Sequence, residues 1–374
     1  MGDLEIRGLV KRFGDNAVVN DVSFSVPEGE FFVLLGPSGG GKTTLLRLVC
    51  GLEQPDAGKV VLAGRDITRL AARERSVGMV FQDYGLYPHM DTFQNIAYGL
   101  EARGTPRGEV ERRVRDAAER LGLTPLLKQV VVDLSGGEQQ RVALARALAK
   151  DADVYLFDEP LSNLDPKLRA QARRDILMLH REKHKPSLYV THDQTEALAI
   201  GDRIGIIAKG RLQQVGRAEE LIHEPANLFV ASFIGTPPMN LMPGSLAREG
   251  EDVHYRVYAD GLALTLPRRW HRALDAYGKG RVIVGIRPSA VAEVGKPSEF
   301  EIRPENVVVG VVEDLQPLVG ETIVTLKVGA GTWFSTVFQE IDESLSPGQA
   351  LRVGVDADQV RLFDPDTEQA FVTS

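Results

Sequence analysis

Short apolar runs alternate with helix-forming stretches over the first 235 residues. The runs EFFVLLG (30–36), VYLF (154–157) and SLYVT (187–191) are each followed by a segment of helical composition. Buried parallel strands are near-continuous apolar runs, and alternation of strands with helices is typical of a parallel sheet covered by helices. We therefore expect a mainly parallel α/β core in residues 1–235.

Two stretches within this region have a different pattern. LEIRGLVKRF (4–13) and VVNDVSFSVPEGE (18–30) predict antiparallel strands joined by a turn. The charged stretch from about 91 to 129 has helical periodicity, and LSGGEQQRVALARAL (134–148) continues as a helix after Glu138. We therefore expect an antiparallel β subdomain at the start and a helical subdomain over about 84–150.

The pattern changes after GTPPMNLMP (235–243), where three prolines in nine residues indicate a boundary. Beyond it the apolar period falls towards two, in short runs such as RVIVGI (281–286), TIVTLKV (322–328) and ALRVGV (350–355), bounded by Gly, Pro and Asp. We predict a second, all-β domain over 236–374, built as a small antiparallel barrel or as a pair of barrel-like halves.

Composition and charge reduce the number of functions that are compatible with the sequence. The 374 residues include 43% hydrophobic ones but, by inspection, no run of 18 apolar residues, so we expect no membrane span. A single cysteine excludes an internal disulfide. Of the net charge of −8, residues 236–374 carry −7, from 13 Lys and Arg against 20 Asp and Glu. Neither half has the basic excess of a nucleic-acid binder, and we expect no nucleic-acid partner.

The segment GPSGGGKT (36–43) matches the phosphate-binding loop G-x-x-x-x-G-K-[ST], with an apolar strand before it and a helix after it. Glycines let the backbone wrap closely around phosphate oxygens, and a helix N-terminus offers unpaired N–H groups. Lys42 would reach the outer phosphates of ATP, and the Thr43 hydroxyl would help to hold Mg²⁺. The predicted ATP-binding residues of this loop are Gly36, Pro37, Ser38, Gly39, Gly40, Gly41, Lys42, Thr43 and Thr44.

Three further strand ends carry polar side chains. VYLFDEP (154–160) ends in Asp158, predicted to approach Mg²⁺ through a water, and Glu159, predicted to orient or deprotonate the attacking water. In SLYVTHD (187–193), His192 follows the end of a strand, where its side chain can contact the γ-phosphate of a bound nucleotide. Gln82 follows the strand MVF (79–81), and its amide either contacts Mg²⁺ and the attacking water or bonds its own loop; the residues alone leave both open.

A helix that begins on its two worst residues needs an explanation. In LSGGEQQR (134–141), Ser135 and Glu138 have the spacing of a capping box, yet Gly136 and Gly137 follow the cap directly. Each glycine costs roughly 0.8–1.0 kcal/mol relative to alanine inside a helix.

Together with GPSGGGKTT and VYLFDEP, the LSGGEQQR segment resembles that of an ATP-binding cassette (ABC) ATPase. The resemblance implies a head-to-tail dimer, in which each ATP lies between the phosphate loop of one subunit and Ser135, Gly136 and Gly137 of the other. It implies that Phe13 stacks on adenine and that Asp165, in SNLD (162–165), reaches across the dimer. It also identifies Gln82 and His192 with the family's catalytic glutamine and histidine.

The segments FQDYGLYPHM (81–90), DEPLSNLDPKLR (158–169) and YVTHDQTEAL (189–198) resemble the sugar-importer branch of this family, as do IGTPPMN (234–240) and GIRP (285–288). The resemblance implies a P-loop NTPase core followed by an oligomer-binding (OB) type regulatory domain. It further implies a second copy or close paralogue as partner, two membrane permeases, an indirectly coupled solute-binding protein, and a place at the cytoplasmic face of the membrane.

The implied activity is ATP hydrolysis that drives uptake of a sugar, an oligosaccharide or a glycerol-phosphate-type solute. The alternatives are an importer of another solute such as polyamine or iron, and a soluble ABC ATPase that acts on nucleic acid or ribosomes. A third alternative, a small-molecule kinase, leaves LSGGEQQR unexplained.

Overall fold

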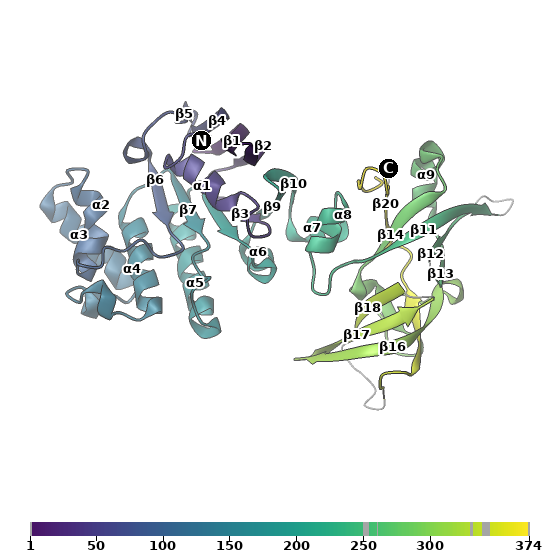
Figure 1. Cartoon of the computed structure of the whole chain (residues 1–374). Helices are drawn as coiled ribbons and strands as arrows, with labels where there is room; N and C mark the ends of the chain where they lie inside the picture. Colours follow the sequence, from purple (N-terminus) through teal and green to yellow (C-terminus); the bar gives the residue numbers. More distant parts are fainter. Residues whose placement is uncertain (1, 250–253, 260, 330–331, 339–344, 373–374) are drawn as a thin grey trace. The chain divides into compact units, whose positions relative to one another are not determined.

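The computed structural model describes residues 2–249, 254–259, 261–329, 332–338 and 345–372, and the chain divides into two units, Met1–Ala218 and Glu219–Ser374 (Figure 1). The proline-rich segment that suggested a boundary at 235 thus lies inside the second unit. The helices α7 (Ala218–His223) and α8 (Leu228–Phe233) precede it. Backbone carbonyls of both helices accept hydrogen bonds from Arg287 of the second unit. These bonds explain why the division between the units falls at the start of α7 rather than at residue 235.

The apolar runs of the first unit form a six-stranded sheet in the order β10-β9-β3-β8-β7-β6. Its strands are β3 (Phe31–Leu35), β6 (Val77–Val80), β7 (Val154–Asp158), β8 (Ser187–Thr191), β9 (Arg203–Ala208) and β10 (Arg211–Gly216). All neighbours are parallel except β9 and β10. The mainly parallel core predicted from the sequence is confirmed. The carboxyl ends of β3, β8, β7 and β6 therefore meet at one edge.

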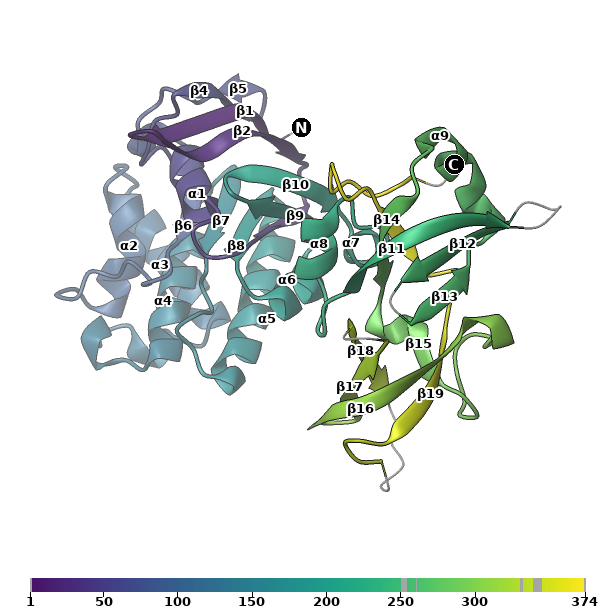
Figure 2. The ribbon, with the colours of Figure 1, turned by 45° about the vertical axis from the view of Figure 1, so that its right-hand side comes forward.

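A second, antiparallel sheet has the order β2-β1-β4-β5. It consists of β1 (Leu4–Phe13), β2 (Asn16–Val26), β4 (Ala57–Leu62) and β5 (Arg65–Asp66). The helix α1 (Lys42–Cys50) lies between the two sheets, because its buried leucines share one core cluster with both (Figure 2). The predicted antiparallel start of the chain is confirmed.

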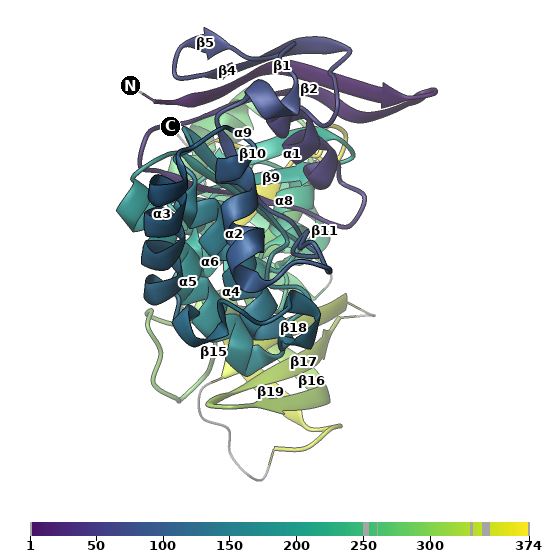
Figure 3. The ribbon, with the colours of Figure 1, turned by 90° about the vertical axis from the view of Figure 1, so that its left-hand side faces the viewer.

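The predicted helical subdomain contains α2 (Thr92–Glu101), α3 (Arg107–Arg120) and α4 (Gly136–Ala149), which contact one another (Figure 3). Two further helices, α5 (Pro166–Lys183) and α6 (Gln194–Ile200), follow β7 and β8 as crossover elements. Short 3₁₀ turns lie at 72–74, 124–126 and 131–133.

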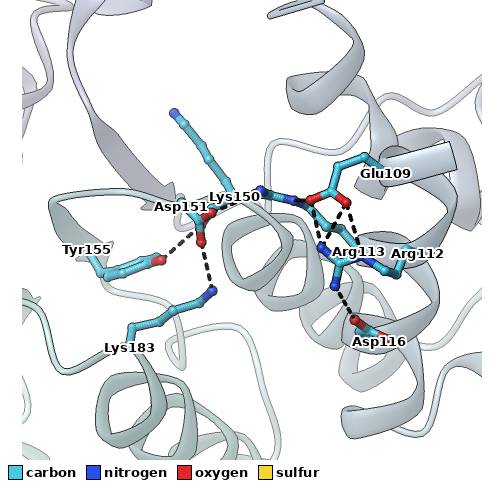
Figure 4. A network of polar contacts seen from close by, with 8 residues as sticks. All are labelled: Glu109, Arg112, Arg113, Asp116, Lys150, Asp151, Tyr155 and Lys183. Atoms are coloured by element: carbon cyan, nitrogen blue, oxygen red, sulfur yellow. Dashed lines mark hydrogen bonds and ion pairs between the residues drawn. The ribbon is translucent and has the colours of Figure 1, made fainter. Parts of the chain in front are cut away.

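Ion pairs join α3 to the core beside it (Figure 4). The Arg113 guanidinium donates to Glu109 on its own helix at 2.5 Å and to Asp151, which precedes β7, at 2.7 Å. The Lys183 ammonium at the end of α5 lies 3.5 Å from the other oxygen of Asp151. The exposed Asp151 carboxylate thus joins α3 to α5.

The second unit contains two five-stranded antiparallel sheets in the orders β13-β12-β11-β14-β20 and β15-β19-β16-β17-β18. The strands of the first are β11 (Asn240–Glu249), β12 (His254–Ala259), β13 (Leu262–Thr265), β14 (Arg281–Ile286) and β20 (Arg361–Phe363). Those of the second are β15 (Val291–Glu293), β16 (Val307–Leu318), β17 (Glu321–Val328), β18 (Thr332–Phe338) and β19 (Ala350–Val355). The two sheets share one apolar core, as the period-two pattern predicts.

The period-two pattern beyond residue 236 does not predict the helices that occur there. The helix α9 (His271–Tyr277) buries Leu274, and 3₁₀ turns lie at 268–270, 288–290 and 304–306. The Arg287 guanidinium of the GIRP segment donates to the carbonyls of Ile222, Ala231 and Ile234, and burial lowers its pKa to about 10. Within the described residues of both units, no helix has the length and apolar character needed to span a bilayer.

Candidate functional site: a phosphate loop and the strand ends beside it

The phosphate loop connects β3 to α1, and its glycines are required by close approaches. A Cβ at Gly36 would lie 2.1 Å from the carbonyl oxygen of Ile207, and one at Gly41 would lie 2.4 Å from that of Val18. Gly41 also has a φ of 98°, which side chains rarely adopt. The loop is therefore packed between β2 and β9, and only glycine fits at these two positions.

The Lys42 side chain is 4% exposed and bends back over its own loop. Its ammonium donates to the carbonyls of Gly36 at 2.9 Å and Pro37 at 3.0 Å, and lies 3.9 Å from Glu159 Oε1. Burial lowers the pKa of Lys42, and the charges of Glu159 and Asp158 oppose that shift. A buried cation so placed favours an anionic ligand.

An oxygen pair suited to Mg²⁺ lies beside the loop. The Thr43 hydroxyl donates to Asp158 Oδ1 at 3.0 Å, and burial raises the pKa of the Asp158 carboxyl. No group of three or more His, Cys, Asp or Glu residues able to hold a metal occurs in the described part of the chain. Mg²⁺ usually keeps several waters and takes one or two carboxylates together with substrate phosphates, so this small donor set fits it.

The Glu159 carboxylate connects the phosphate loop to His192. Its Oε2 lies 2.8 Å from His192 Nδ1, while its Oε1 faces Lys42. Glu159 follows β7 with a φ of 43°, an unusual value for a residue with a side chain. The side chain of Glu159 is 15% exposed and that of His192 is 53% exposed. A shielded carboxylate thus faces an accessible imidazole, an arrangement suited to activating a water.

Gln82 follows β6 and is exposed. Its backbone carbonyl accepts a hydrogen bond from Asn163 Nδ2 at 3.0 Å. Asn163 belongs to the SNLD segment, and no role was predicted for it from the sequence. Its one distinguishing feature in the sequence is that it is an amide side chain in a short polar segment after β7.

The helix α4, which contains most of the LSGGEQQR segment and is called the signature helix below, begins as the capping box predicts. The backbone N–H and the hydroxyl of Ser135 donate to Glu138 Oε2 at 2.9 and 2.6 Å. A Cβ at Gly136 would meet nothing closer than 3.9 Å, whereas one at Gly137 would lie 3.2 Å from the flexible Leu168 side chain. The packing of this chain therefore does not explain the glycine at 136.

Two other predicted residues lie on neighbouring elements. Asp165 is the N-cap of α5, and its Oδ1 accepts from the N–H groups of Lys167 and Leu168 at 3.0 Å. Phe13, at the end of β1, is 49% exposed, with the Lys11 ammonium 5.1 Å from its ring centroid. An exposed aromatic ring at a strand end is available for stacking.

Contacts join some of the predicted residues and leave others apart. Lys42, Glu159 and His192 form one chain of contacts, and Thr43 bonds to Asp158 beside it. Among the residues that the structure describes, no hydrogen bond or ion pair joins Phe13, Asp165 or residues 135–137 to Lys42. The roles assigned to these five residues stay predictions, as do those assigned to the residues that meet.

Comparison with known proteins identifies the family. The chain is 40% identical to the sn-glycerol-3-phosphate import ATP-binding protein 1 of Rhizobium johnstonii, over 98% of this chain and 95% of the relative. It is also 40% identical to the trehalose/maltose import ATP-binding protein of Thermococcus litoralis, over 99% and 100%. The family described as ABC transporter matches residues 19–162, and the MalK OB fold domain matches residues 235–291. The chain belongs to the ABC transporter family.

A solved structure agrees with this assignment. A nucleotide-free ATP-binding cassette from an ABC transporter covers 59% of this chain and 93% of its own, with 26% identity and a TM-score of 0.54. The expected P-loop NTPase core and OB-type second domain of this ABC protein are thus confirmed.

Proposed function

We propose that the protein is the ATP-hydrolysing subunit of an ABC importer. The observation that carries the proposal is the contact chain Lys42–Glu159–His192 at the carboxyl edge of the sheet, beside the Thr43–Asp158 pair. Phosphate binding, a shielded carboxylate and a polarising imidazole are the parts that nucleoside triphosphate hydrolysis needs.

In the proposed reaction, Lys42 releases its own loop carbonyls and binds the β- and γ-phosphates of ATP. Glu159 accepts a proton from water as the water oxygen attacks the γ-phosphorus, and the bond to the bridging oxygen of ADP breaks. His192, held by Glu159, contacts the departing phosphoryl group. Thr43, Asp158 and Gln82 would hold Mg²⁺, which when bound neutralises charge on the phosphates.

The open space at Gly136 supports a head-to-tail dimer. A helix start without side chains exposes N–H groups and the positive end of the helix dipole, which favour an approaching phosphate. The chain has one phosphate-loop lysine, Lys42, so the second phosphate-facing helix start would serve the nucleotide of a partner. In this proposal Ser135, Gly136 and Gly137 contact the γ-phosphate bound by a second copy or a close paralogue.

The names of the relatives support an imported sugar, oligosaccharide or glycerol-phosphate-type solute. Two membrane permeases would carry the solute across, and a separate binding protein would deliver it to them. The subunit would act at the cytoplasmic face of the membrane.

The test uses Glu159→Gln, which keeps the shape of the side chain but cannot accept the proton. We expect it to bind ATP, to associate stably with a second copy, and to lower the turnover number at least roughly a hundredfold. Glu119→Gln, on the exposed side of α3, is the matched control and should behave as the unaltered protein. Full-rate hydrolysis by Glu159→Gln would refute the assigned base.

The transport role is tested by purifying the ATP-trapped Glu159→Gln protein from detergent-solubilised native membranes. Copurification of two polytopic membrane proteins is expected. Recovery of ribosomal or DNA-bound proteins instead, with no membrane protein, would refute the importer proposal while leaving the ATPase assignment intact.

A further inference from the structure

The segment that follows Gln82 is held against the signature helix by one arginine. Arg146, on α4, donates from Nη1 to the carbonyl of Gly85 at 2.6 Å and from Nη2 to the carbonyl of Tyr84 at 2.8 Å. The two bonds span 61 and 62 residues of sequence. Burial lowers the pKa of Arg146, and the nearby Tyr87 and Asp83 oppose that shift.

The backbone held in this way is strained. Tyr84 has a φ of 62°, a region that residues with a side chain rarely adopt, and Gly85 follows with a φ of 56°. A Cβ at Gly85 would lie 3.0 Å from the Phe81 ring, so the bend is closely packed. Such a conformation persists where its surroundings impose it. Here the guanidinium bonds both residues of the bend.

The same segment lies close to the start of α4. The hydroxyl of the buried Tyr84 lies 3.9 Å from the Cβ position of Gly136, while its carbonyl bonds to Arg146 more than two turns further along the helix. On its other side, Asn163 bonds to the carbonyl of Gln82. Residues 82–85 are therefore fixed both to α4 and to the segment after β7.

We propose that Arg146 is a positioning residue for Gln82, holding the 82–85 bend so that the Gln82 amide reaches the catalytic site and moves together with α4. This rests on the proposed ATPase function. Arg146 itself contacts no reacting atom. Through Tyr84, a displacement of Gln82 on nucleotide binding is passed to the end of α4 where Gly136 would meet the partner's ATP.

The test is a double-variant cycle on the full-length protein. Arg146→Met removes both hydrogen bonds but keeps an unbranched side chain, and Gln82→Ala removes the positioned amide. We expect each single variant to lower the ATP turnover number roughly tenfold to a hundredfold, with the affinity for ATP changed less than about threefold because the phosphate loop is untouched. In the Gln82→Ala background, Arg146→Met should lower turnover by less than about twofold.

A purely structural arginine would give a different result. Loss of fold stability would lower turnover by the same factor with or without Gln82, and such multiplying effects would overturn the proposal. Arg146→Lys keeps the charge and one donor group, and is expected to restore part of the turnover. If Arg146→Met does not fold, the same cycle with Arg146→Lys decides between coupled and independent effects. Arg115→Met, at an exposed position of α3, controls for the loss of an arginine.

Failure of the proposed ATPase function can be distinguished from failure of the positioning role of Arg146. If Gln82→Ala and Glu159→Gln both leave turnover unchanged, the catalytic assignment is wrong. If both lower turnover but Arg146→Met multiplies with Gln82→Ala, only the positioning role is refuted.

Discussion

Gly136→Ala should affect stability and function in opposite directions. The new methyl group would meet nothing closer than 3.9 Å, from Leu164 and Tyr84, so the fold accommodates it without displacement. Alanine is favoured over glycine by roughly 0.8–1.0 kcal/mol within a helix. Because Gly136 is the first residue of α4, up to about 1 kcal/mol is the expected gain. For a unit of this size that corresponds to an increase in Tm of at most about 2–4 °C.

The methyl group would nevertheless hold off a phosphate approaching the helix start. We expect the Gly136→Ala chain to bind ATP with unchanged affinity, since its own phosphate loop is intact. In the Glu159→Gln background, the ATP-dependent increase in mass should disappear. Light scattering after size exclusion measures association, calorimetry measures ATP affinity, and thermal unfolding measures stability.

Gly108→Ala is the matched control. Gly108 is also near the start of its helix, α3, and a Cβ there would meet nothing within 4 Å. The control should show a similar stability change with normal ATP-dependent association. Normal association by Gly136→Ala would refute the argument that this glycine makes room for a partner's nucleotide, and a clear loss of stability would refute the argument about open space.

Two further predictions concern a buried arginine and a half-buried lysine. Arg75 is 1% exposed and donates to the carbonyls of Leu48, Val49, Thr68 and Leu70 at 2.7–3.0 Å. Arg75→Met removes these hydrogen bonds and should lower the free energy of unfolding, measured in urea, by at least about 3 kcal/mol. A loss under about 1 kcal/mol would contradict the assigned bonds. Burial lowers the pKa of Lys150, whose side chain is drawn in Figure 4, to about 8, and its ammonium donates to the carbonyl of Val77. Below pH 8 the Lys150 ammonium is protonated in both the folded and the unfolded state, so folding bears the full cost of burying its charge. Between about pH 8 and the ordinary pKa of lysine, the unfolded state binds more protons than the folded state. The contribution of Lys150 to stability therefore rises with pH in this range. The unfolding free energy of the unaltered protein minus that of Lys150→Met should therefore increase from pH 7 to pH 10, and a constant difference would refute the shifted pKa.

The chemistry of the site could be predicted from contiguous segments. A glycine-rich loop between a strand and a helix, or a strand that ends in Asp158 and Glu159, defines its local geometry within a few residues. The prediction of the Ser135–Glu138 cap succeeded for the same reason, since both partners lie on one helical turn. The period-two pattern predicted the β-rich second domain, but it did not predict α9, because seven residues carry little periodicity.

The sequence by itself therefore determined the fold class, the family and the candidate residues of the site, because each depends on neighbours along the chain. Only the tertiary structure decided which of these groups meet. Glu159 faces both Lys42 and His192 because β7 and β8 pair in parallel and β8 pairs with β3, an order of strands that no local pattern specifies. Arg146 and Tyr84 lie in stretches that read as ordinary helix and core, and their bond arises only where α4 packs beside the segment after β6. Side chains whose role is to hold distant backbone in place leave no local signature, since their partners are carbonyl groups that every residue possesses.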